Sequence, residues 1–193
     1  MNYLAHCYFS TGTQNSLYGN LLGDFVKGKN HGYVDPEIIK GIVLHRAIDK
    51  FTDNHPIVSH SKDRISKERK RFSGIMIDVF YDHFLAMHWD NFSSSDFELQ
   101  TRNWYEKLNA ETEIELPERM LISIQRMKQN DWFAKYKTFD GISAAINGIS
   151  KRIKFENKLA GGGKELEQNY SDLESDFNDF FPELIEYVQT IRH

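Results

Sequence analysis

The chain has 193 residues, of which 40% are hydrophobic and 27% are charged, and its formal net charge is −4. This length allows one domain with a sizeable core, and the composition is that of a globular protein rather than a disordered one. The acidic balance excludes a general attraction to nucleic acid or to an anionic membrane surface. Cys7 is the single cysteine, which excludes an intramolecular disulfide and favours a reducing compartment.

The sequence shows neither a secretion signal nor a membrane span. Its first residues lack a basic segment followed by a long apolar core. The longest apolar run, residues 74–89, is too short and is interrupted by Asp78, Asp82, His83 and His88. We therefore expect a cytoplasmic protein that binds no membrane.

Helical periodicity runs through the chain, with only four prolines and no alternating strand pattern. The predicted helices span residues 2–10, 15–27, 35–53, 58–72, 74–91, 96–110, 117–129, 141–149 and 171–191. Asp35 and Pro36 mark a helix start, because aspartate caps the first turn and proline fits the first helical position. Turns are predicted at 28–33 and at the triple glycine 161–163. We expect an all-α fold, a single-domain helical bundle.

Four of these predicted helices carry two polar side chains, four residues apart, of the kinds that bind metals. Residues four apart lie on one face of a helix, and here that face should be buried. The pairs are Asn2/His6, Asn20/Asp24, His45/Asp49 and Asp78/Asp82. A buried carboxylate costs several kcal/mol unless it is paired or bound to a metal. The pairs therefore predict a polar centre on which several helices converge.

The most demanding pair is Asp78 and Asp82, which lie among large apolar residues. Two carboxylates one turn apart on a buried face repel each other. No lysine or arginine occurs in residues 74–89 to neutralise them. We therefore expect a cation between them, either a metal ion or an arginine from elsewhere in the chain, such as Arg46.

Each of the other pairs also has an interpretation without a metal. His45 and Asp49 can form an internal hydrogen bond that fixes their helix. Asn20 and Asp24 can cap neighbouring helices, and His6 can be a satisfied histidine of the core.

Histidines and carboxylates without a thiolate suit Mn²⁺, Mg²⁺ or Fe²⁺ better than a structural zinc ion. The expected metal ligands are Asp24, His45, Asp49, Asp78 and Asp82. A metal that activates water and neutralises phosphoryl oxygens points to hydrolysis at phosphorus. A nearby aspartate or histidine then takes the proton, and an arginine holds a phosphate oxygen. The expected catalytic residues are Asp24, Asn20, His6, Arg46 and His83.

Residues 62–71 carry six basic and two acidic side chains. Such a run is usually a solvated helix face, but in an acidic chain it is also a local positive patch for an acidic partner. The candidate partner-binding residues are Lys62, Arg64, Lys67, Arg69, Lys70 and Arg71. Further basic residues, Lys151, Arg152, Lys154 and Lys158, extend the patch.

Six segments of the chain form a recognisable series. MNYLAH begins at residue 1, GNLLGDFV at 19, GIVLHRAID at 41, FTD at 51, DVFYDHFL at 78 and NGISKR at 147. With the last helix they resemble the acyl carrier protein phosphodiesterase family, also called acyl carrier protein hydrolases, over essentially the whole chain. The resemblance implies an all-helical fold distantly related to HD-type phosphohydrolases. It also implies a dependence on Mn²⁺ or a similar ion, and removal of 4′-phosphopantetheine from holo acyl carrier protein, a small and very acidic substrate.

Two other functions stay open. One is an HD-like phosphohydrolase that acts on a nucleotide or another small phosphoester. The other is a non-enzymatic helical adaptor that binds an acidic protein through residues 62–71, with the buried acids serving as internal hydrogen-bond partners.

Overall fold

The computed structural model describes residues 1–28, 32–109 and 111–192, and within these ranges every regular element is a helix. The elements are α1 (Tyr3–Tyr8), α2 (Gln14–Leu22), α3 (Pro36–Asn54), α4 (Pro56–Arg64), the 3₁₀ helix η1 (Lys70–Phe72), α5 (Ser73–Met87), α6 (Trp89–Phe92), α7 (Phe97–Leu108), α8 (Glu118–Gln129), α9 (Trp132–Lys135), α10 (Phe139–Arg152), α11 (Lys164–Gln168) and α12 (Tyr170–Ile191). The predicted all-α fold is confirmed. In the described part of the chain, no helix combines the length and apolarity that crossing a bilayer requires.

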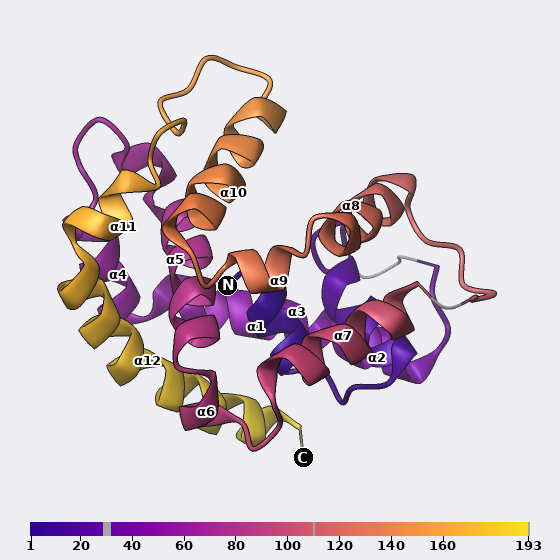
Figure 1. Cartoon of the computed structure of the whole chain (residues 1–193). Coiled ribbons are helices and arrows are strands. Elements are labelled where there is room, and N and C mark those ends of the chain that lie inside the picture. Colours follow the sequence, from indigo (N-terminus) through magenta and orange to yellow (C-terminus); the bar gives the residue numbers. More distant parts are fainter. Residues whose placement is uncertain (29–31, 110, 193) are drawn as a thin grey trace.

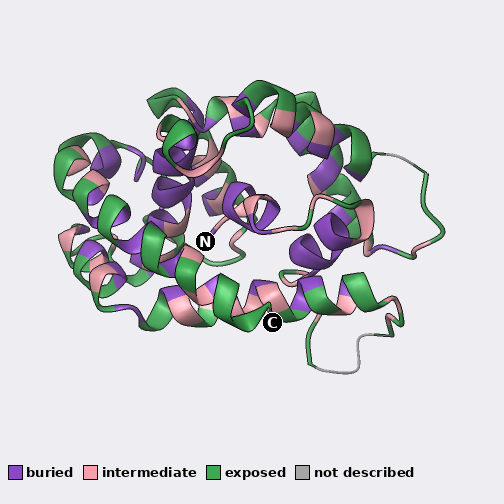
Figure 2. Ribbon diagram, turned by 90° about the horizontal axis from the view of Figure 1, so that it is seen from below, coloured by how far each residue is buried: buried purple, intermediate pink, exposed green. Residues whose placement is uncertain are grey.

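Helix α5 is the centre of the fold, and α1, α4, α10 and α12 pack against it (Figure 1). From Met76 to Ala86, every α5 side chain except Asp78 is buried. Figure 2 shows the buried residues mainly on the faces that the helices turn toward one another. The predicted central helix is therefore confirmed, although it ends at Met87 and is followed by the separate short helix α6.

Helices α2 and α3 form the most extensive helix pair among the described residues. Two glycines allow their backbones to touch. A Cβ atom at Gly19 would lie 2.5 Å from the Ile38 carbonyl oxygen, and one at Gly41 would lie 2.7 Å from the Gly19 backbone. Only glycine fits such a close approach of two backbones. The contact holds the face of α3 that carries His45 directly against α2.

The start of α3 agrees with the prediction. The Asp35 carboxylate accepts the amides of Glu37 and Ile38, and Pro36 is the first helical residue. The predicted turn at 28–33 includes residues 29–31, which lie outside the described residues, as does residue 110 at the end of another predicted helix. Gly161, with φ +75°, begins the predicted turn at 161–163.

The predicted basic helix 58–72 is wrong, because α4 ends at Arg64. Ile65 is extended and buried, and the amide and hydroxyl of Ser66 both donate to the Glu165 carboxylate. The Glu165 side chain, from a distant segment, thus accepts hydrogen bonds from Ser66, and the chain turns away from the axis of α4. Helices α9 and α11, each of at most five residues, were not predicted from periodicity, since they are too short to repeat an apolar face.

Candidate metal centre

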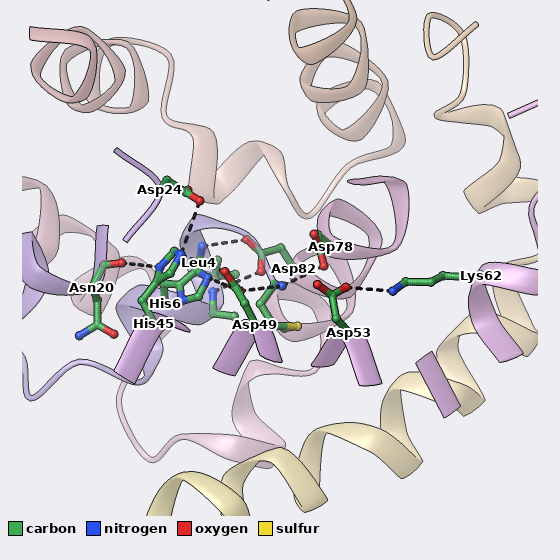
Figure 3. A network of polar contacts seen from close by, with 12 residues as sticks. Leu4, His6, Asn20, Asp24, His45, Asp49, Asp53, Lys62, Asp78 and Asp82 are labelled. Atoms are coloured by element: carbon green, nitrogen blue, oxygen red, sulfur yellow. Dashed lines mark hydrogen bonds and ion pairs between the residues drawn. The ribbon is translucent and has the colours of Figure 1, made fainter. Parts of the chain in front are cut away.

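His45 on α3 is held in one orientation by α2. Its Nδ1 lies 2.6 Å from the main-chain carbonyl oxygen of Asn20, which requires the proton to be on Nδ1. Its Nε2 then points toward two carboxylates, 3.0 Å from Asp49 Oδ2 and 3.5 Å from Asp24 Oδ1 (Figure 3). A carbonyl that accepts from one ring nitrogen and leaves the other free is the usual support of a metal-binding histidine. The Asn20 side chain itself donates to the Ser16 carbonyl, 2.9 Å away.

His6 on α1 lies against His45. The two rings stack with their centroids 3.8 Å apart, and His6 Nε2 is 3.2 Å from Asp49 Oδ1. Both nitrogens of His6 are buried, and among the described residues Nε2 faces only the Asp49 carboxylate while Nδ1 has no hydrogen-bond partner. Buried polar atoms without a partner are uncommon, and an ion bound at the ring satisfies one of them.

His6, His45 and Asp49 form a group whose ligand atoms all lie within 4.8 Å of one another, the one group of this kind in the described part of the chain. Two imidazoles and one carboxylate leave several coordination positions open for water or substrate. Such a ligand set suits a catalytic divalent ion. The residues present therefore fit the expected metal.

The group also has an uneven charge distribution. Burial lowers the pKa of His6 to about 4, aided by the neighbouring charge of His45. Burial acts against protonation of His45 too, but Asp24 and Asp49 outweigh it and raise the pKa of His45 to about 9. The two imidazoles likewise outweigh burial at Asp49 and hold the pKa of its carboxyl group well below the usual range. His6 is therefore neutral, whereas His45 carries a proton that would have to leave before Nε2 could bind a metal.

Asp24 lies in the turn after α2, not on the helix that was predicted to carry it. Its side chain is 50% exposed and forms the solvent edge of the group. Burial opposes ionisation, yet His45 holds the pKa of the Asp24 carboxyl group below its usual value. Gly23, which precedes it, leaves room for the His45 ring, because a Cβ atom there would overlap that ring.

Asp78 and Asp82 lie beside this group and do not join it. Asp78 Oδ1 is 2.8 Å from the α-ammonium group of Met1, which is also 3.5 Å from Asp49 Oδ1. Asp82 accepts the amides of Leu4, at 2.8 Å, and Ala5, at 3.2 Å, and so caps α1 (Figure 3). Helix α1 has no cap of its own. The structure therefore does not bring both acids to one point with His45 and Asp49.

Burial raises the pKa of Asp82 to about 7, and the two amides and the Met1 ammonium only partly oppose it. Burial also raises the pKa of the Asp78 carboxyl group more than the Met1 ammonium lowers it. We expected a metal ion or an arginine to neutralise these two acids. The cation found beside them is the α-ammonium group of Met1. No side-chain pattern signals it.

Two further expected catalytic side chains are engaged elsewhere. Arg46 donates to the carbonyls of Val26, at 3.0 Å, and Gly28, at 2.7 Å, and so anchors the segment after α2. His83 Nδ1 lies 2.7 Å from the Tyr136 carbonyl oxygen, and Nε2 lies 3.3 Å from the Tyr170 hydroxyl. The structure brings neither side chain to the group of His6, His45 and Asp49.

The basic segment 62–71 is largely neutralised within the chain. Four of its cations meet acids: Lys62 with Asp53, Arg64 with Asp172 and Asp176, Arg69 with Glu165, and Lys70 with Asp63. Lys67 is exposed, and the Arg71 guanidinium lies 4.9 Å from the Phe155 ring centroid. Little of the expected positive patch is left for a partner.

Comparison with known proteins covers nearly the whole chain. A family profile described as "Acyl carrier protein phosphodiesterase" matches residues 1–184. A protein of that name from Escherichia coli O6:H1 (strain CFT073) is 34% identical over 187 residues, which are 96% of each chain. Proteins of the same name from Shigella boydii serotype 18 and Salmonella paratyphi A are each 33% identical over 186 residues, again 96% of each chain. No solved structure matches the chain.

Proposed function

The chain belongs to the acyl carrier protein phosphodiesterase family, and we propose from this membership that it hydrolyses holo acyl carrier protein. The bond cleaved is the phosphodiester between 4′-phosphopantetheine and a serine of the carrier. The products are apo acyl carrier protein and free 4′-phosphopantetheine. The observation that carries the proposal is the group of His6, His45 and Asp49, with the half-exposed Asp24 carboxylate at its edge.

The residues that would hold a divalent ion are His6, His45 and Asp49. Mn²⁺ is the first choice, and Mg²⁺ and Fe²⁺ are the alternatives. When bound, the ion supplies charge neutralisation at the phosphoryl oxygens and lowers the pKa of water. The buried, unpartnered Nδ1 of His6 and the Nδ1 contact of His45 with the Asn20 carbonyl support this assignment. Asp78 and Asp82 are not needed as ligands, because the Met1 ammonium and the amides of α1 engage them.

Asp24 is suited to the role of general base. Its carboxylate is ionised at neutral pH and borders both His45 and solvent. A water molecule that attacks phosphorus passes a proton to Asp24, and the bond from phosphorus to the serine oxygen breaks. The departing serine oxygen takes up a proton from solvent and Asp24 returns its proton to solvent, so the carrier leaves with a free hydroxyl group and the carboxylate is regenerated.

The cellular setting we propose is the cytoplasm. Cys7 is free and lies in the core, where burial raises the pKa of its thiol. A buried thiol with a raised pKa is unreactive, and a single cysteine forms no internal disulfide. The protein therefore does not depend on an oxidising compartment.

The test is mass spectrometry of holo acyl carrier protein after incubation with the metal-loaded protein. We expect conversion to the apo mass with Mn²⁺, and loss of conversion in the variants His6→Ala and Asp49→Ala. Asp53→Ala is the matched control, since Asp53 is an exposed aspartate on the same helix and its carboxylate pairs with Lys62. An unchanged holo mass with Mn²⁺, Mg²⁺ and Fe²⁺ refutes the proposal. Cleavage of small phosphoesters alone would instead support the nucleotide-type phosphohydrolase, and absence of metal uptake would support the adaptor.

A further inference from the structure

Residues of α8, α9 and α10 and of the start of α1 line a pocket of about 350 Å³. Figure 1 shows α8 and α10 on either side of α9. Its walls are mainly apolar and include Ala144, Ala145 and Ile149 of α10, with Trp132 of α9 opposite. Pockets of this size hold small molecules or extended chains. Of the residues singled out from the sequence, Asn2, Lys151 and Arg152 lie on its wall.

The lining carries four cations and no acid: Arg126, Lys135, Lys151 and Arg152. No described residue forms an ion pair with any of the four, although the chain as a whole has a net charge of −4. This differs from residues 62–71, where most cations meet an acid of the same chain. Unpaired cations around a concave, low-dielectric wall concentrate positive potential at that point. The charge of the rim is therefore complementary to an anionic ligand or an acidic protein.

The pocket adjoins the metal centre through α1. Asn2 and Tyr3 line it, and His6 lies one turn farther along the same helix. The Asn2 amide donates to the Tyr136 hydroxyl, at 3.2 Å, which joins α1 to the pocket floor. Burial and then the Asp24 carboxylate raise the pKa of the Tyr3 phenol, and Arg152 opposes them. The phenol thus lies within electrostatic reach of both the solvent edge of the centre and the cationic rim.

We propose that this pocket receives the pantetheine arm of the substrate, while Arg126, Lys135, Lys151 and Arg152 face the acidic surface of the carrier protein. The assignment rests on the proposed function and adds the binding mode. With the phosphate at the metal centre, the arm passes Tyr3 and enters the pocket. The mainly apolar wall suits the methylene and methyl groups of the arm, and polar groups of the lining can meet its amides. The acidic protein that carries the arm then covers the rim, where its charges meet cations that have no partner in this chain.

The rim is tested by the double variant Arg126→Glu/Arg152→Glu. Its matched control is Arg102→Glu/Lys128→Glu, which makes the same charge change at exposed cations outside the pocket. For holo acyl carrier protein, we expect KM to rise about tenfold in the rim variant, and the effect to shrink as salt screens the charges. The control should keep the wild-type KM. Hydrolysis of bis(4-nitrophenyl) phosphate, which lacks a protein, should be equal in all three. A KM that is unchanged in the rim variant, or changed equally in the control, overturns the assignment.

The wall is tested at Gly148, in the middle of α10. A Cβ atom there would meet nothing within 4 Å, so Gly148→Phe fills the pocket without moving the backbone. We expect kcat/KM for holo acyl carrier protein to fall about tenfold, the loss of roughly 1.4 kcal/mol of transition-state binding. Binding of apo acyl carrier protein, which lacks the arm, should be unchanged, as should cleavage of bis(4-nitrophenyl) phosphate. The exposed Ser175→Phe on α12 is the control for added bulk.

Turnover of holo acyl carrier protein by the wild-type protein distinguishes failure of the proposed function from failure of the pocket assignment. If the wild-type protein does not convert holo acyl carrier protein, the proposed function fails and the pocket assignment fails with it. If it does convert the carrier, and Gly148→Phe keeps the wild-type kcat/KM, the pocket assignment alone fails. An equal loss on the carrier and on the small phosphodiester also overturns it, since the wall would then support the metal centre.

Discussion

The imidazole rings of His6 and His45 stack with their planes 19° apart and their centroids 3.8 Å apart, and Asp49 lies between their Nε2 atoms at 3.2 and 3.0 Å. Two stacked imidazoles at this distance cannot both carry a charge at low cost, because like charges repel in a buried site. In the metal-free protein the proton therefore resides on His45, whose pKa is raised to about 9, and His6 is neutral, with its pKa lowered to about 4.

Metal binding should release a proton. His45 has to lose its proton before Nε2 can coordinate, so the affinity for Mn²⁺ should rise about tenfold per pH unit between roughly pH 6.5 and 9. Titration calorimetry in two buffers of different ionisation enthalpy measures the number of protons released, and we expect about one per ion near pH 7.5. An affinity that does not vary with pH in this window contradicts the assignment of His45 as a ligand.

The same shift predicts how stability varies with pH without metal. The folded-state pKa of His45 lies above its unfolded value, so its contribution is fully present below about pH 6.5 and is lost as pH rises toward 9. We expect the difference in free energy of unfolding between wild type and His45→Gln to shrink across this window. Urea unfolding at pH 6 and pH 9 measures it, with EDTA present. A constant difference would show that the two carboxylates do not hold the proton on His45.

Asp24→Ala should abolish turnover of holo acyl carrier protein while the helical circular dichroism stays intact. The carboxylate is half exposed and lies beyond the end of α2, and its removal leaves the buried His45 still paired with Asp49. We expect kcat to fall by about 10²–10⁴, the usual contribution of a general base. Asp53→Ala, which removes an exposed aspartate paired with Lys62, is the control and should keep the wild-type rate. Near-normal activity of Asp24→Ala would exclude this residue from the chemistry.

Gly23→Ala should impair metal binding more than stability. The added methyl group would overlap the His45 imidazole, which must then swing away from Asp49. We expect the affinity for Mn²⁺ to fall by about 10–100-fold, as for other changes that misorient a ligand. Gly74→Ala serves as control, because its Cβ atom would make only an ordinary contact with the Lys62 side chain. If both variants bind Mn²⁺ equally well, His45 does not need the orientation seen here.

Arg64→Ala should lower the free energy of unfolding without changing the rate of hydrolysis. Arg64 donates to the buried carboxylate of Asp176, at 2.8 and 3.1 Å, which also accepts the Ser61 hydroxyl at 2.7 Å. Removal of the cation leaves that carboxylate short of a partner, at a cost of roughly 1–3 kcal/mol in the free energy of unfolding. Lys67→Ala, at an exposed cation, should change it by no more than about 0.5 kcal/mol. A selective rise in KM for the carrier with unchanged stability would instead restore residues 62–71 as the docking surface.

Local patterns in the sequence predicted the helices that are long enough to repeat an apolar face. The Asp35–Pro36 start of α3 and the apolar run of α5 needed no information beyond their own residues. The same holds for His45 and Asp49, because a spacing of four within one helix brings the side chains together whatever the helix packs against. The break of the basic helix could not be predicted in this way, since its cause, Glu165, lies 99 residues from Ser66.

The sequence by itself determined the fold class, the direction in which the pairs His45/Asp49 and Asp78/Asp82 face along their helices, and the family to which the chain belongs. The tertiary structure alone decided what each pair meets. His6 gains Asp49 and His45 because α1 lies against α3, whereas Asp82 points at the amides of α1 and Asp78 at the ammonium of Met1. The spacing of two residues along a helix determines only which side of that helix their side chains face. A metal site needs three side chains to converge on one point, and the packing of α1 against α3 is what brings His6 to His45 and Asp49.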